Sequence, residues 1–305
     1  MIARIVPALS ILSCALACTS DLLPASVITR TRIVAVRADP PELAPSGTSR
    51  LDALVVDPDG GTHAFAWYAC APRAPGESSP CTSTDTVGDE DALASSPGVR
   101  LVGSSTSAWL MADAEVPLEP ARTIDVVLFV DDGAHGLTAR KEVRVTSSTP
   151  NQNPEVAFVV ASGFRVEDDD EIVSTPEVEI PWSAIVTEAS TEAFERRLPG
   201  GSTERDVEGL TYEWLTTWGR FGLPYRPPSA RPVVELFVDS GLPPPRDASF
   251  EEGGGKSSAD DRGPKVTLRL PAGIPEPNPI KVIVLVRDGR GGVGWAARSL
   301  LVRDR

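Results

Sequence analysis

Side chains suited to acid–base catalysis are sparse in this chain of 305 residues. Its two histidines, His63 and His135, each follow a glycine-bearing stretch that predicts a turn. The sequence shows no glycine-rich phosphate loop, nucleophile elbow, zinc-ligand spacing or cysteine–histidine pair. Serine is plentiful, but a Ser-His-Asp arrangement needs a histidine base in reach. We therefore predict solvated turn histidines, no cofactor and no enzymatic activity.

Two acidic clusters are the candidates for metal binding. Asp57-Pro58-Asp59-Gly60 and the run from Glu167 to Glu171 offer the hard oxygen ligands that calcium prefers. Neither cluster follows the ligand periodicity of an EF-hand. The alternative, which we favour, is that both clusters are solvated acidic turns that bind no metal. The calcium candidates within the clusters are Asp57, Asp59, Asp168 and Asp170.

An aromatic segment from Trp218 to Tyr225 is the candidate for binding. It places Trp218, Arg220, Phe221 and Tyr225 within eight residues. Exposed rings with an arginine suit a sugar or peptide surface, because rings form contacts at low entropic cost. The alternative, which we prefer, is that the rings cover a hydrophobic core from a loop.

The first residues predict export. Met1 to Arg4 carry a positive charge, and Ile5 to Ala17 are apolar but too few to span a bilayer. No other stretch approaches the roughly 20 apolar residues that a spanning helix needs. We predict a signal peptide over 1–17 and a short tether over 18–26.

The end of this segment, Ile11-Leu12-Ser13-Cys14-Ala15-Leu16-Ala17-Cys18, resembles the lipobox of bacterial lipoproteins. The resemblance implies a diacylated cysteine at the mature N-terminus, and two acyl chains anchor a protein stably. Neither cysteine has the favoured leucine three residues upstream. Cleavage before Cys18 leaves Cys70 and Cys81 as an even pair that can form a disulfide, so we favour Cys18 over Cys14. The alternative is an ordinary secretory signal cut without lipidation.

Two similar stretches predict the fold. Residues 126–145 and 280–302 each hold an apolar run, a glycine-bearing turn and a second run, which together are typical of a β-hairpin. Each follows a series of short apolar segments separated by turns. We interpret each hairpin as the last element of a β-sandwich domain.

The segments before the first hairpin carry a family resemblance. Asp57-Pro58-Asp59-Gly60, then Phe65-Ala66-Trp67, then a closing hairpin look like PKD and related bacterial immunoglobulin-like domains. Tyr212-Glu213-Trp214 matches the Trp67 strand in a second copy, which lacks the Asp-Pro-Asp-Gly turn. The resemblance implies that Trp67 and Trp214 fill the core between two sheets.

The second copy also contains less regular segments. Pro181 within 178–182 predicts an edge strand or a bulged one. Residues 188–197 suggest a short helical turn inside an inserted loop. We expect a further strand over 233–238 and a mobile loop over 242–263.

The chain is therefore predicted to be all-β, with two tandem immunoglobulin-like (PKD-like) β-sandwich domains after an N-terminal signal peptide. The first domain covers 27–147, a polar linker covers 148–154 and the second domain with inserted loops covers 155–305.

The net charge of -14 disfavours a nucleic-acid partner, because binding phosphates requires clustered Lys and Arg. The whole chain resembles the envelope lipoproteins of myxobacterial type. That resemblance implies an outer-membrane lipoprotein, facing the periplasm or the cell surface, with the membrane as partner through a lipid anchor. We expect a non-enzymatic binding or structural module that presents a protein or glycan contact surface. The alternative is an accessory subunit of an envelope enzyme or secretion assembly.

Overall fold

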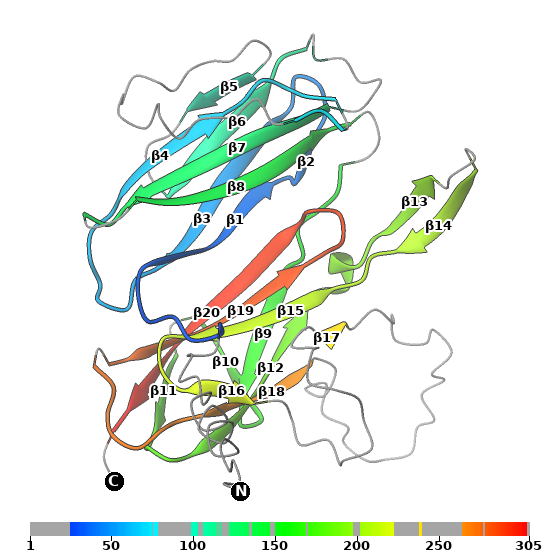
Figure 1. Cartoon of the computed structure of the whole chain (residues 1–305). Coiled ribbons are helices and arrows are strands. Elements are labelled where there is room, and N and C mark those ends of the chain that lie inside the picture. The colour runs from blue at the N-terminus through cyan, green and yellow to red at the C-terminus, as the bar shows by residue number, and fades with distance from the viewer. Residues whose placement is uncertain are drawn as a thin grey trace, which may run out of the picture.

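The computed structural model of the chain is built almost entirely from β-strands (Figure 1). It describes residues 25–74, 76–78, 99–102, 106–114, 116, 122–133, 136–146, 150–168, 170–197, 202–222, 238–239, 264–276 and 278–303. Two immunoglobulin-like sandwiches stack end to end along the long axis of the molecule. In the described part of the chain, no helix has the length and apolar character needed to cross a membrane.

The first sandwich packs two four-stranded sheets against each other. One sheet has the order β1-β3-β6-β5, formed by Arg32–Asp39, Thr48–Val56, Ser107–Ala112 and Val99–Val102. The other has the order β2-β8-β7-β4, formed by Glu42–Leu43, Gly136–Val145, Arg122–Asp131 and Ala64–Ala69. Alternating side chains from both sheets fill the core, as the period of a half-buried strand requires. Trp67 is fully buried there, opposite Leu128 of the closing hairpin, which confirms its predicted place.

The second sandwich repeats this plan and adds to it. Its sheets have the orders β10-β9-β12-β18-β16 and β11-β20-β19-β15-β17. The strands of the first sheet are Phe164–Val166, Val156–Ala161, Glu179–Val186, Lys265–Arg269 and Arg220–Gly222. Those of the second are Glu171–Ser174, Val293–Val302, Ile280–Arg287, Thr211–Thr216 and Val238–Asp239. In both sandwiches a short strand runs parallel to the last strand, and the tryptophan strand pairs with the first strand of the closing hairpin.

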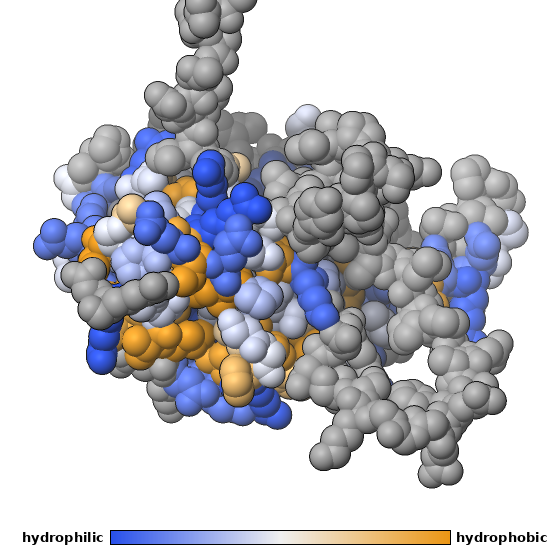
Figure 2. Space-filling view, turned by 90° about the horizontal axis from the view of Figure 1, so that it is seen from below, coloured by the Kyte–Doolittle hydropathy of each residue, from blue (hydrophilic) through white to orange (hydrophobic). Residues whose placement is uncertain are grey.

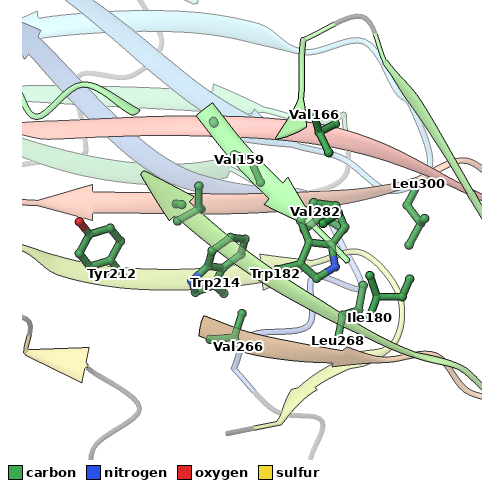
Figure 3. Packing of buried hydrophobic residues seen from close by; sticks show 14 of the residues in the cluster. Val159, Val166, Ile180, Trp182, Tyr212, Trp214, Val266, Leu268, Val282 and Leu300 are labelled. Carbon is green, nitrogen blue, oxygen red and sulfur yellow. The ribbon is translucent and has the colours of Figure 1, made fainter. Parts of the chain in front are cut away.

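The core of the second sandwich forms around two tryptophans (Figure 3). Trp214 from β15 and Trp182 from β12 face each other across the two sheets, with ring centroids 6.3 Å apart and planes tilted by 57°. Both side chains are buried. The burial of Trp214 was expected from the repeat, whereas Trp182 is an additional ring on the opposite sheet.

Pro181 does not lie in an edge strand, so that part of the prediction was wrong. β12 has β9 on one side and β18 on the other, and its irregular pairing falls at 185–186. The carbonyl oxygen of Pro181 accepts a hydrogen bond from Ser162 N at 2.8 Å. The nitrogen and carbonyl of one strand residue point to the same side, so the missing N–H faces the β9–β10 turn. A central strand tolerates proline there because the missing N–H lies one residue beyond the last register pair with β9, Trp182 with Ala161.

The helical prediction for 188–197 was mostly wrong. Only Glu188–Ser190 form a turn of 3-10 helix, η2. The following strands β13 and β14, Ala193–Arg197 and Thr203–Val207, pair as an antiparallel hairpin that projects beside the sandwich (Figure 1). Helix formers such as Ala, Glu and Arg dominate β13, and cross-strand pairing overrides their propensity. The expected strand over 233–238 lies outside the described residues except for Val238, and so does the loop over 242–263.

Candidate functional site

The two sandwiches meet through a third hydrophobic cluster, which we call the joint core. The first sandwich contributes Val34, Ala35 and Val56 from β1 and β3. The second contributes Leu215, Ile283, Leu285 and Val293 from β15, β19 and β20, and Ile28 joins from the segment before β1. All eight side chains are buried. The Arg37 guanidinium lies 4.5 Å above the Trp295 ring at the edge of this cluster, which adds a cation–π contact between the domains.

Beside the joint core, Arg290 holds carboxylates from both sandwiches. Its guanidinium lies 2.9 Å from Glu42 of the first sandwich. It also lies 3.2 Å from Glu208 and 3.5 Å from Glu192 of the second. The side chains of Glu42 and Glu208 are buried, so each depends on its partners for the solvation it has lost.

The predicted linker takes part in this joint. Asn151 is fully buried; its N–H donates to Glu42 at 3.0 Å and its side-chain amide donates to Asp288 at 3.0 Å. The side-chain amide of Asn153 donates to the carbonyl of Ala38, and its oxygen accepts from Val293 N at 2.9 Å. The polar groups of this stretch thus find hydrogen-bond partners on both domains.

Two glycines allow the linker to approach the tip of the closing hairpin. A Cβ on Gly294 would collide with the carbonyl oxygen of Pro154. A Cβ on Gly292 would collide with the Asp288 carboxylate and lie 3.0 Å from the Gln152 carbonyl oxygen. The glycine-rich tip is thus explained by close approach as well as by hairpin geometry.

Burial shifts the pKa values of two ionisable groups in the joint. Burial raises the pKa of Glu208 to about 7, helped by the negative charge of Asp288, and the Glu192 N–H and Arg290 oppose this only in part. Burial also lowers the pKa of Lys141, whose ammonium donates to the Gly291 carbonyl across the domain boundary. The charged groups here are paired with other protein groups, and these pairs link the two domains.

The predicted aromatic segment packs mainly against the second core. Trp218 and Phe221 are half-buried against it, and the Phe221 ring lies 5.7 Å from that of Trp214. Arg220 is exposed on β16, and Tyr225 lies outside the described residues. This placement gives the two rings the core role weighed in the sequence analysis, and a binding role for the segment stays a prediction.

The acidic candidates do not converge on a metal position. Asp57 accepts hydrogen bonds from Asp59 N and Gly61 N within its own turn. Asp168 pairs with Arg298 at 2.6 Å, and Asp170 accepts from Glu167 N at 2.7 Å. Among the described residues, no group of three or more His, Cys, Asp or Glu side chains is arranged to hold a metal ion.

Burial works to raise the pKa of Asp57, but the Asp59 and Gly61 N–H donors, the nearby His63 and a hydrogen bond with Thr31 together lower it. His63 is half-buried beside Asp57, with 3.2 Å between Nε2 and the carboxylate, so the expectation of a solvated histidine was wrong.

The remaining candidates lie at or beyond the limits of the described residues. His135, Cys14 and Cys18 fall outside them. Cys70 follows β4 and its N–H donates to the Asp125 carbonyl at 2.9 Å, while Cys81 is outside. The Cys70–Cys81 disulfide and lipidation at Cys18 or Cys14 therefore stay predictions.

An exposed row on the first sandwich was missed by the sequence analysis. Arg50, Trp109 and Val102 are register partners across β3, β6 and β5, and all three face outward. Trp109 is 51% exposed and Val102 is 52% exposed. Strand alternation gave the signal: the neighbours of Trp109, Ala108 and Leu110, are buried, so the ring must face away from the core.

Comparisons with known proteins add little beyond the fold. No family model and no curated protein matches the chain. The N-terminal Ig1-2 module of the Drosophila receptor protein tyrosine phosphatase DLAR is 7% identical, with 90% of this chain and 99% of that one covered and a TM-score of 0.21. Murine CEACAM1b is 10% identical, with coverages of 88% and 99% and a TM-score of 0.22.

A nucleoside hydrolase-related hypothetical protein from Saccharophagus degradans is 21% identical, with a TM-score of 0.23. The match covers 34% of this chain and only 21% of that protein. TM-scores this low carry no argument about function.

Proposed function

We propose that this chain is a non-enzymatic lipoprotein of the cell envelope, held in the outer membrane by Cys18, that presents a protein contact surface. The observation that carries the contact surface is the exposed row of Arg50, Trp109 and Val102. Tryptophan and arginine are enriched among the residues that dominate the energetics of protein interfaces, and this row presents both to solvent.

The joint supports this proposal by fixing the position of that row. Trp109 pairs with Arg50, six positions from Val56 at the joint end of β3, so the row lies toward the far end of the first sandwich. The joint core, Arg290 and the linker hydrogen bonds hold the sandwiches as one body. A rigid spacer displays a contact surface at a defined distance from its anchor.

The test measures capture of an envelope partner by the full chain after detergent solubilisation. Trp109→Ala and Arg50→Ala are expected to remove the captured protein, with the melting temperature within a few degrees of the parent. The matched control is Phe164→Ala, another exposed aromatic at the opposite end of the molecule. Capture unaffected by Trp109→Ala would contradict the contact surface. Capture abolished by soluble glycans would show that the partner is a glycan instead of a protein.

A further inference from the structure

The segment that leads to the proposed anchor packs in the joint core and forms backbone hydrogen bonds with the second sandwich. Thr216 N donates to the Ser26 carbonyl at 2.9 Å, and Ile28 N donates to the Thr216 carbonyl at 2.8 Å. Thr216 lies opposite Val282, two positions from the start of β19 at Ile280. The tether therefore leaves the molecule at the margin of the joint core, two strand positions from the end of the second sandwich where β19 begins, which we call the distal end.

The length of the tether limits how far this end can stand from the membrane. Cys18 precedes Ala25 by seven residues. Seven fully extended residues span at most about 25 Å, because each adds about 3.3–3.6 Å. The tether therefore keeps Ala25, and the part of the second sandwich beside it, within about 25 Å of a bilayer that holds acyl chains on Cys18.

The distal end exposes large apolar side chains. Phe164 is 76% exposed in the β9–β10 turn, Val173 is 54% exposed in β11 and Ile274 is 47% exposed in the loop between β18 and β19. Phe164 and Val173 line a hollow of about 400 Å³, together with Ile172 and Ile180. The view from below in Figure 2 shows hydrophobic side chains gathered on this face.

The turn that carries Phe164 is held in place. Ser162 and Gly163 both have positive φ, 51° and 84°, as in the tight hairpin turns that match the twist of β-strands. Ser162 N is also bonded to the Pro181 carbonyl. Phe164 therefore projects from a fixed backbone.

We propose that the distal end of the second sandwich is a lipid-contact surface, with Phe164 and Val173 inserted at the level of the headgroups of the bilayer that holds the anchor. The charges nearby favour a zwitterionic lipid surface. Arg165 and Arg298 are already paired with Glu167 and Asp168 at 2.6 Å each, and Asp170 adds a further negative charge. This inference rests on the proposed anchoring and adds an orientation: the first sandwich, with Trp109, points away from the lipid.

The test uses the full lipidated chain in phosphatidylcholine vesicles that contain brominated acyl chains, which quench nearby tryptophan. Phe164→Trp is expected to add a fluorescence component that the brominated lipid quenches strongly. Val207→Trp is the matched control, because Val207 is 40% exposed on the lateral hairpin far from the distal end. It should add a component that is not quenched. Quenching should be unchanged in high salt, since the contact is apolar.

A second measurement removes the Phe164 ring instead of replacing it with tryptophan. Phe164→Ser in a full-length Cys18→Ser chain should weaken flotation with the same vesicles by about tenfold, given the transfer free energy of a phenylalanine side chain. An anchored chain in which Phe164→Trp is no better quenched than Val207→Trp would overturn the lipid contact and leave the anchor intact. A mature N-terminus without acyl chains, seen by mass spectrometry, would instead overturn the anchor itself.

Discussion

The two closing hairpins share a sequence pattern but have different surroundings. In the first, Val127 and Phe129 on the outer side of β7 are half-buried, and the tip at Asp131 is exposed. In the second, Ile283 and Leu285 on the outer side of β19 are buried in the joint core. Each tip has an aspartate that accepts an N–H two residues further on, Asp131 from Gly133 and Asp288 from Arg290. The same local structure thus ends one domain at solvent and connects the other to its neighbour.

What distinguishes the second tip is its polar content. Arg290 follows the turn aspartate and spans the boundary to Glu42, and the glycines at 292 and 294 admit the linker. The second hairpin connects the domains because Arg290 at its tip pairs with buried carboxylates of both domains. Gly292 and Gly294 also leave room for the backbone of the linker.

Removal of the Arg290 cation should have the largest effect. Arg290→Met leaves Glu42 and Glu208 buried without their shared partner, and breaking such a buried pair costs about 3–5 kcal/mol. Calorimetry should show the single unfolding transition split into two, one for each sandwich. The control at the first tip, Asp131→Ala, removes one exposed turn bond and should change stability by less than about 1 kcal/mol. One unshifted transition for Arg290→Met would show that the tip does not couple the domains.

A side chain at Gly294, where the linker backbone passes, should have the next largest effect on stability. Gly294→Ala places a methyl group against the Pro154 carbonyl, and overpacking of this kind costs about 3 kcal/mol when backbone has to move. Leu137→Ala, at the corresponding position after the first tip, removes a half-buried side chain and should cost about 1 kcal/mol. Chemical denaturation gives the free energy of unfolding of both variants. Equal losses in the two variants would contradict the close approach of the linker backbone to Gly294.

The pH dependence of stability should also show an effect of the joint. Folding raises the pKa of Glu208 to about 7, so the unfolded chain ionises at lower pH than the folded one. Stability should therefore fall as pH rises from about 4.5 to about 7 and stay level above, by about 3–4 kcal/mol in total at about 1.4 kcal/mol per pH unit. Glu208→Gln should flatten this decline, measured as melting temperature against pH. Glu142→Gln on the exposed face of β8 serves as control and should leave the decline in place.

The sequence predicted the strands well where alternation or an apolar run was clear. Trp67, Trp214 and both closing hairpins lie where the repeat placed them, because their burial depends on local pattern. The apolar run 282–286 also carried an unused signal. A strand buried on both faces reads as a continuous apolar run, and β19 is such a strand. The run at 126–130 is equally apolar, although the outer face of β7 is only half-buried. The sequence alone therefore could not show which of the two strands is buried on both faces.

The joint was not predictable because its partners are far apart in the chain. Glu42 lies beside two prolines, Asn151 lies in a polar stretch and Arg290 lies in a glycine turn, and each local context is typical of a solvated loop. Their burial depends on how two domains meet, which no local pattern encodes. The β13–β14 hairpin was missed for a related reason: its strand character comes from the partner strand.

The pairing of Ser26 and Ile28 with Thr216 has a consequence for the order in which the two sandwiches fold. Ser26 and Ile28 find their hydrogen-bond partner on a strand made much later in synthesis. These hydrogen bonds can form only when the second sandwich is folded, because closing so long a loop of unfolded chain has a high entropic cost. We therefore expect the first sandwich to fold before Ser26 and Ile28 pair with Thr216.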